Sequence, residues 1–305
     1  MTAPIPRKYG TPHGNKIAAA IANRKAIQQD KDLLGEIQEA YGRWVADLVA
    51  TIPDESPEAR VRRQAELLND YKFFVEVDCV AKRGSPWLKR QKGQLKLDNS
   101  IIEEFLIHLV HPATLPGFNR LDELAVGPNQ AFMSMSFRAG SLSGLLDKPE
   151  VVVKTKDQDF TLGARLHYAI GTSPDLSGAT RGSFVLAVLA AECKVNLDKT
   201  MFQEASGTAT RLKQGCPMAK YFLVAEFLDM TPEDVRLTDI DNVFLLRPSR
   251  RLGPQQRGNA EEVEKYHREN PIRADVIWRF VQEMQSFIDA VWYDPSSVLE
   301  RGSFI

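Results

Sequence analysis

The chain has 305 residues, of which 43% are hydrophobic and 26% are charged, and its formal net charge of −1 is typical of a globular protein with a substantial core. No apolar run approaches the roughly 20 residues that a membrane-spanning helix needs, and Met1–Gly14 lacks the apolar stretch of a secretory signal. Three scattered cysteines without metal-ligand spacing, Cys79, Cys193 and Cys216, indicate a reduced, cytoplasmic protein.

The first hundred residues are predicted to be mainly helical. Apolar residues at helical spacing indicate an amphipathic helix within 17–50, and Ser56-Pro57 predicts the start of a second helix. The stretch from Lys82 to Leu97 then carries six basic residues and no acid. Such a basic stretch fits a DNA-binding loop, and it fits a solvated loop equally well.

The middle of the chain combines strands and helices. Asp98 to Ser100 precede an apolar helix over 101–110, and Asp198 can cap a helix that ends near Gln214. Strands are expected at 151–154, 164–170, 184–194, 221–228 and 243–246, and a last helix at 272–292. Because the helix after Asp198 connects two strands, that pair is expected to be parallel. The predicted fold is α/β, with a mixed central sheet flanked by helices and a helical N-terminal region.

The third of these strands carries the chemistry. Eight apolar or small residues, Phe184 to Ala191, run into Glu192-Cys193-Lys194. Because side chains alternate along a strand, Glu192 and Lys194 share one face while Cys193 turns to the other. Asp175 lies upstream in the pair Pro174-Asp175 and offers a second carboxylate. Two acids and a lysine suit a hard divalent cation that activates water against a phosphodiester.

A similar pattern elsewhere in the chain shows how weak the spacing is alone. Pro53-Asp54 followed by Asp70-Tyr71-Lys72 repeats it, but Asp70 and Lys72 fall on a predicted helix, where residues two apart point in different directions. The copy at Glu192 ends an apolar strand and precedes a capped helix. A surface hairpin that carries only an ion pair is the alternative interpretation of Asp175, Glu192 and Lys194.

The motif resembles that of the PD-(D/E)XK nuclease superfamily, and the string Glu192 to Glu204 is similar to the BbvCI-like type II restriction endonucleases. The resemblance implies a Mg²⁺-dependent cut in double-stranded DNA at a short sequence, with Mn²⁺ as a possible substitute. It implies that Asp175 and Glu192 bind the metal and that Lys194 serves the attacking water. The backbone carbonyl of Cys193 is a plausible third ligand. Three further residues are candidates for a supporting role, namely Glu103, Glu104 and Gln203.

The resemblance also bears on partners and on the division of the chain. The resemblance to the narrow group implies an enzyme made of two different subunits. The sequence leaves open whether this chain forms a homodimer or a heterodimer with a related nuclease subunit. Candidate DNA contacts are Lys82, Arg83, Lys89, Arg90, Lys92, Arg250 and Arg251. The predicted regions are a helical part with a basic arm (1–97), a nuclease core (98–250) and a C-terminal loop and helix (251–305).

A type II restriction endonuclease, or one subunit of it, is therefore the predicted function. A repair or structure-specific nuclease of the same fold is one alternative. A DNA-recognition subunit without catalytic activity is another.

Overall fold

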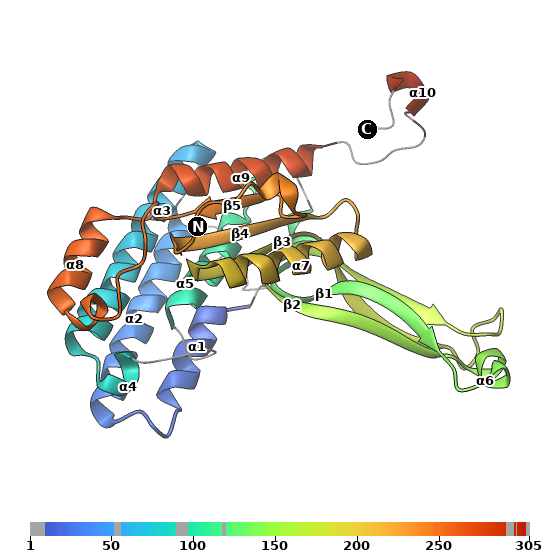
Figure 1. The fold of residues 1–305 in the computed structure, drawn as a ribbon, viewed down its shortest axis with the longest axis horizontal. Coiled ribbons are helices and arrows are strands. Elements are labelled where there is room, and N and C mark those ends of the chain that lie inside the picture. The colour runs from blue at the N-terminus through green and yellow to red at the C-terminus, as the bar shows by residue number, and fades with distance from the viewer. Residues whose placement is uncertain are drawn as a thin grey trace.

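A computed structural model describes residues 10–51, 56–89, 97–117, 120–290, 296 and 298–302. Its centre is a five-stranded sheet in the order β1-β2-β3-β4-β5 (Figure 1). The strands are β1 (Ala125–Arg138), β2 (Glu150–Ile170), β3 (Thr180–Leu197), β4 (Lys220–Leu228) and β5 (Asn242–Leu245). Strand β2 runs antiparallel to both β1 and β3, and β1 also makes a parallel contact with β3. Strands β3, β4 and β5 run parallel. The prediction of a mixed sheet flanked by helices is confirmed.

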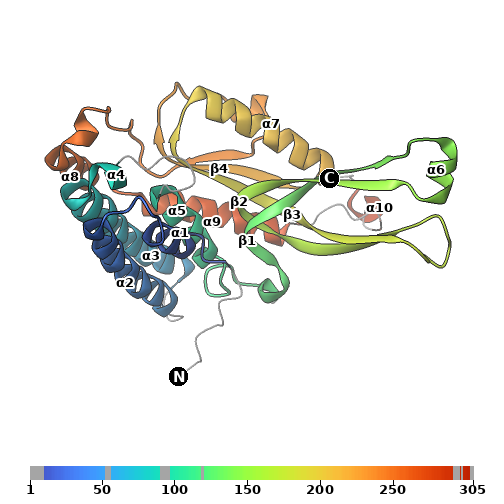
Figure 2. The same ribbon diagram turned by 90° about the horizontal axis from the view of Figure 1, so that it is seen from below.

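Helices cover the two faces of the sheet unequally. One face carries α7 (Lys199–Gly215), which crosses from β3 to β4. The other face carries most of the remaining helices: α1 (Pro12–Ile21), α2 (Gln28–Ala50), α3 (Pro57–Phe73), α5 (Leu97–Leu109) and α9 (Ala274–Asp289). Figure 2 shows this helical layer and α7 on opposite sides of the strands.

Shorter elements complete the chain. A π-helix, η1 (Phe74–Ala81), continues α3, and the short helix α4 (Pro86–Lys89) follows it. The others are η3 (Leu121–Glu123), α6 (Leu142–Asp147), η4 (Val235–Leu237), η5 (Gln256–Gly258), α8 (Ala260–Glu269) and α10 (Val298–Arg301). None of the helices described here is long and apolar enough to cross a membrane.

Local sequence signals explain several boundaries. The Ser56 hydroxyl accepts a hydrogen bond from the amide of Ala59 at 3.2 Å, and Pro57 occupies the first turn of α3. Asp198 likewise accepts from the amide of Met201 at 2.9 Å and begins α7. Both predicted helix starts are therefore confirmed.

The structure differs from the sequence prediction in the strands before Glu192. The two strands predicted at 151–154 and 164–170 are parts of one strand, β2. The strand β1 was not predicted, because Gly127 and Pro128 interrupt its pattern. Helix α8 also lies in a stretch that was expected to be a loop.

Strand β2 joins two ribbons that project from the body of the molecule as one arm. The pairing of β2 with β3 shifts register between Leu162 and Gly163. A Cβ at Gly163 would overlap the carbonyl oxygen of Leu186, so only glycine fits this close approach. Beyond it, the ribbons β1–β2 and β2–β3 extend to the same side (Figures 1 and 2). Thr172 donates a hydrogen bond to the carbonyl of Asp147 near the end of the arm.

Two hydrophobic clusters pack on the two faces of the sheet. The larger unites the N-terminal helices, α9 and one face of the strands, including Phe160, Ala191 and Cys193. The smaller lies between the other face and α7 and contains Phe202 and Tyr221. The larger cluster includes residues from all three regions predicted from the sequence, so these regions share a core.

Candidate active site

The end of β3 presents the predicted carboxylate and ammonium on one face of the sheet. The side chains of Glu192 and Lys194 are partly exposed, whereas Cys193 is buried in the larger core. Lys194 Nζ lies 2.6 Å from Glu192 Oε1. Tyr221, on the neighbouring strand β4, donates its hydroxyl to Glu192 Oε2 at 2.6 Å. The alternation of faces predicted along this strand is therefore confirmed.

Both groups of the Glu192–Lys194 pair are charged at neutral pH. Burial opposes the charge of Glu192, but the hydrogen bond and the positive charge of Lys194 lower the pKa of this carboxyl below its usual value. Burial likewise opposes the charge of Lys194, and the contact with Glu192 raises its pKa. Burial raises the pKa of Tyr221, so its hydroxyl stays protonated and keeps donating.

A second carboxylate reaches this strand from β2. The amide of Cys193 donates a hydrogen bond to Asp159 Oδ2 at 2.8 Å. Phe160 pairs with Ala191, so continuing the antiparallel register places Asp159 opposite Glu192. Burial and the negative charge of Glu103 raise the pKa of Asp159 to about 6, although the hydrogen bond from Cys193 acts in the opposite direction. The structure thus joins Asp159, Glu192 and Lys194.

Asp159 was missed by the sequence interpretation. Its signal was an acid directly before Phe160-Thr161-Leu162, three residues of types that favour β-strands or pack in their cores. Only the pairing of β2 with β3 shows that this acid lies beside the Glu-x-Lys strand.

Asp175 lies far from the other members of the predicted set. It is exposed in the turn between β2 and β3, where its carboxylate accepts hydrogen bonds from the Ser173 hydroxyl at 2.5 Å and the Ser177 amide at 2.9 Å. These hydrogen bonds lower the pKa of Asp175 to about 2. The strand from Thr180 to Glu192 alone spans roughly 40 Å. The expectation that Asp175 and Glu192 share a metal is therefore corrected, because a hairpin arm separates them.

The structure also separates the two supporting acids on α5. Glu104 accepts hydrogen bonds from the amides of His13 and Gly14, at 2.8 and 3.2 Å, and from the Tyr41 hydroxyl at 2.5 Å. These contacts attach α1 and α2 to α5, so Glu104 has a structural role. Glu103 instead lines the same cavity as Asp159.

Glu103 is held at this cavity by two neighbours. Asn99 Nδ2 donates to Glu103 Oε1 at 2.6 Å, and Lys16 Nζ lies 3.5 Å from the same oxygen. Gln203, the third candidate for a supporting role, is exposed on α7. Among the residues described, it has no hydrogen bond to Glu192, Lys194 or Asp159.

The donor set fits a hard divalent cation. No group of three or more histidine, cysteine, aspartate or glutamate side chains is arranged around one metal position within the described ranges. Mg²⁺, however, keeps several waters and is commonly bound by one or two carboxylates together with substrate phosphate. Asp159 and Glu192 supply two such carboxylates on adjacent strands, and the proximity of Glu103 adds negative charge that a cation would offset.

The basic residues predicted to contact DNA have different environments. Lys82 pairs with Asp78 at 3.0 Å and with Glu264 at 2.7 Å, and Arg83 pairs with Glu36 at 2.9 Å. Their charges are therefore already neutralised within the protein. Arg90 and Lys92 lie outside the described residues.

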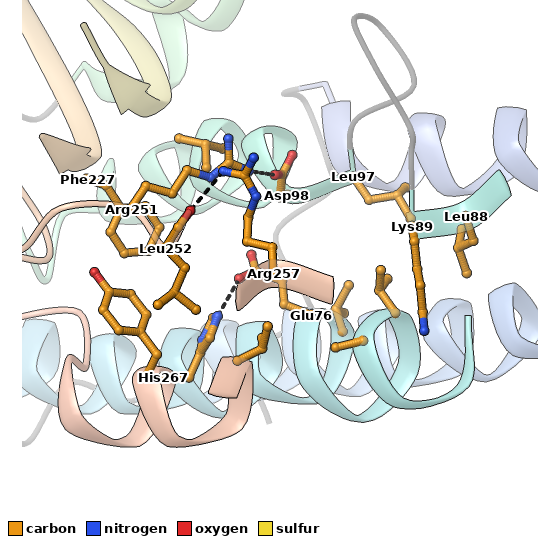
Figure 3. A pocket seen from close by; sticks show the side chains of 16 residues that line it. Glu76, Leu88, Lys89, Leu97, Asp98, Phe227, Arg251, Leu252, Arg257 and His267 are labelled. Atoms are coloured by element: carbon orange, nitrogen blue, oxygen red, sulfur yellow. Dashed lines mark hydrogen bonds and ion pairs between the residues drawn. The ribbon is translucent and has the colours of Figure 1, made fainter. Parts of the chain in front are cut away.

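Lys89 and Arg251 line a second cavity of about 220 Å³, together with Arg257 (Figure 3). Arg251 lies 3.8 Å from Asp98, and Arg257 donates to the carbonyl of Leu252 at 3.1 Å. Arg250 lies beside Arg251 in the segment between β5 and α8. These cations have weaker pairing than Lys82 and Arg83, so they are more available to a phosphate.

Comparison with known proteins agrees with this architecture. The solved structure described as "native BbvCI A2B2 tetramer at low resolution" has a TM-score of 0.64 and 21% identity, and the match covers 92% of this chain and 97% of that chain. At this identity the likeness shows the fold. No curated protein matches the chain. A family model described as "Bpu10I restriction endonuclease" matches residues 94–304. This match covers more than half of the sequence, from the helix of Glu103 through the strand of Glu192, and the chain therefore belongs to the Bpu10I restriction endonuclease family.

Proposed function

We propose that this chain is a subunit of a type II restriction endonuclease and that it hydrolyses a DNA phosphodiester bond with the aid of a divalent metal ion, preferably Mg²⁺. The observation that carries the proposal is the convergence of Asp159, Glu192 and Lys194 where β2 meets β3. Membership of a restriction endonuclease family supports it. The arrangement agrees with a PD-(D/E)XK site in which Asp159 takes the role that the sequence interpretation gave to Asp175.

The roles follow from chemistry and position. Asp159 and Glu192 would hold the ion, and the backbone carbonyl of Cys193, the residue after Glu192 on β3, is the candidate third ligand. A bound divalent ion neutralises phosphate charge and lowers the pKa of a coordinated water. Tyr221 holds one oxygen of Glu192 through its hydroxyl, which fixes the orientation of this carboxylate. Glu103 supports the site from α5 by its negative charge beside Asp159.

Lys194 would act as a cation. Its raised pKa keeps the ammonium protonated at neutral pH, so it is poorly suited to remove a proton from water. It can instead donate hydrogen bonds to the attacking water and offset the charge that builds on the phosphate. Its contact with Glu192 at 2.6 Å places this charge next to the proposed metal ligand.

Partners are part of the proposal. The BbvCI structure is described as an A2B2 tetramer. We infer that this chain also works as an oligomer on double-stranded DNA, either with a second copy or with a related subunit. Lys89, Arg250 and Arg251 are the described candidates for contacts with the DNA backbone, since Lys82 and Arg83 are paired within the chain. Arg90 and Lys92, which lie outside the described residues, stay candidates.

Cleavage of plasmid DNA in Mg²⁺ tests this function. The chain is assayed alone and together with the product of a neighbouring gene, as the wild type and as Lys194→Ala. Lys199→Ala is the matched control, because Lys199 is an exposed lysine whose nearest carboxylate, Glu233, is 3.7 Å away. We expect discrete linear or nicked products from the wild type and the control, and a loss of about a thousandfold in rate for Lys194→Ala.

Three outcomes would change the proposal. Full activity of Lys194→Ala would remove Lys194 from the chemistry. Cleavage only when a partner is present, unaffected by changes at Glu192 and Lys194 of this chain, would identify it as a recognition subunit. Cutting confined to branched DNA or to ends would indicate a structure-specific nuclease.

A further inference from the structure

A groove of about 490 Å³ opens beside Asp159 and Glu103 at the base of the arm. Its lining comes from both ribbons: β1 contributes Asn129 and Gln130, β2 contributes residues before and after Gly163, and β3 contributes 183–185. The groove therefore begins at the proposed metal site and continues between the two halves of the arm.

The first unusual feature of this groove is a buried acceptor without a partner. Gln158 is only 5% exposed, and its Nε2 donates to the carbonyl of Asp157 at 3.0 Å. Its Oε1 has no hydrogen-bond partner in the described part of the chain. A buried polar atom of this kind is costly for the folded protein unless a ligand satisfies it. Gln158 thus lines the groove with a buried amide whose oxygen lacks a partner among the described residues.

Two further side chains have hydrogen-bonding capacity to offer. Asn129 Nδ2 donates to the carbonyl of Gly127 at 3.1 Å and to the Thr161 hydroxyl at 3.0 Å, which fixes its amide and leaves Oδ1 as an acceptor. Arg165 is exposed and, among the residues that the structure describes, has no ion pair or hydrogen bond from its guanidinium. The remaining lining is mostly polar, so the groove is poorly suited to an apolar ligand.

We propose that this groove binds the edges of DNA base pairs next to the phosphate that is cut, and that Arg165, Gln158 and Asn129 determine sequence preference there. The inference rests on the proposed function. Arginine donates two parallel hydrogen bonds to O6 and N7 of guanine, and an amide oxygen accepts from the exocyclic amino group of adenine or cytosine. Arg165 therefore reads a G·C pair, and the two amide oxygens read an adjacent amino group.

The geometry of the arm supports this use. A two-stranded β-ribbon is narrow enough to enter the major groove of B-DNA, where each base pair shows a distinct set of donors and acceptors. The ribbons are solvent-exposed on both faces around 154–157 and 164–167, so a duplex can approach Arg165 and the rim of the groove. Because the groove adjoins Asp159, base contact and metal position are set by the same strand.

Selection of bound duplexes from a randomised library, in Ca²⁺ so that DNA is bound without being cut, tests the inference. The full chain is compared with Arg165→Ala and Gln158→Met. The matched control is Arg138→Ala, because Arg138 lies farther along the arm and already pairs with Glu150 at 2.8 Å. We expect the wild type and the control to enrich one short sequence. Arg165→Ala should lose about tenfold in preference for one G·C pair and keep its affinity for unselected DNA.

Enrichment of the same sequence, with unchanged preferences, by Arg165→Ala and Gln158→Met would overturn the inference. Failure of the wild type to enrich any sequence would also overturn it. The proposed cleavage is tested separately in Mg²⁺. Selective binding without cutting would reject the catalytic proposal and support the base-reading groove. Cutting by variants whose sequence preference is unaltered would support the catalytic proposal and reject the base-reading groove.

Discussion

Acidification should weaken this protein through His13, a buried side chain that attaches α1 to the helix of Glu103. Its Nδ1 lies 2.9 Å from the Ser100 hydroxyl, and its Nε2 lies 2.8 Å from the Tyr71 hydroxyl. The Ser100 hydroxyl itself donates to the carbonyl of Leu97 at 2.8 Å. Nδ1 therefore carries the proton and donates to Ser100, while Nε2 accepts from Tyr71. A second proton has no place in this arrangement.

The size of the effect follows from the pKa. Burial, followed by the positive charges of Lys72 and Lys16, lowers the pKa of His13 from 6.5 to about 3. The unfolded chain therefore takes up a proton below about pH 6.5, whereas the folded chain does so only near pH 3. Stability is fully present above the unfolded pKa and is lost as the pH falls toward the folded pKa. At pH 5 the expected loss is about 2 kcal/mol.

Urea unfolding at pH 7 and pH 5 measures this loss, with His13→Gln as the comparison. Glutamine stays neutral at both pH values, and the other titrating groups are the same in both proteins. The wild type should lose about 2 kcal/mol more than the variant between the two pH values. Equal losses in the two proteins would show that protonation of His13 does not weaken the fold.

Three further substitutions test other parts of the structure. Lys72→Met should cost about 3–5 kcal/mol of unfolding free energy, because Lys72 is fully buried between Glu76 and Glu226, at 2.5 and 3.0 Å. The control Lys265→Met, at an exposed lysine, should cost under about 1 kcal/mol, and similar costs for the two variants would contradict the buried network. Gly163→Ala should destabilise the protein by about 3 kcal/mol, since its Cβ would meet the Leu186 carbonyl. The control Gly42→Ala in α2 has open space and should stabilise the protein slightly. Equal changes in thermal denaturation for the two variants would contradict the close approach at Gly163. Tyr221→Phe should slow plasmid cleavage about tenfold with DNA affinity unchanged, because Glu192 loses a hydrogen bond; an unchanged rate would show that this contact does not position the carboxylate.

Sequence patterns predicted the half of the site that is local in the chain. Glu192 and Lys194 could be placed on one face because an apolar strand precedes them and the helix capped by Asp198 follows. The general arrangement of a mixed sheet with helices on its faces followed from the same periodic patterns.

The other half of the site is set by long-range pairing, which short-range patterns do not encode. Asp159 comes to β3 because Phe160 pairs with Ala191 and β2 changes register at Gly163. Asp175 was chosen because it precedes the strand closely in sequence, yet β3 begins at the far end of a hairpin arm and carries the chain away from it. Proximity along the chain was misleading because an antiparallel hairpin separates the residues at its turn from those at its base.

Asp159 and Asp175 are the two carboxylates that compete for the role of metal ligand beside Glu192, and one cleavage experiment compares them. Plasmid cleavage in Mg²⁺ is measured for the wild type, Asp159→Asn and Asp175→Asn, with the same partner composition in each case. Asp159 lies beside Cys193 and Glu192, whereas Asp175 contacts only Ser173 and Ser177 among its described hydrogen bonds. We expect Asp159→Asn to lose cleavage by about a thousandfold, whereas Asp175→Asn should cut at the wild-type rate. Cleavage that survives in Asp159→Asn and disappears in Asp175→Asn would contradict this expectation.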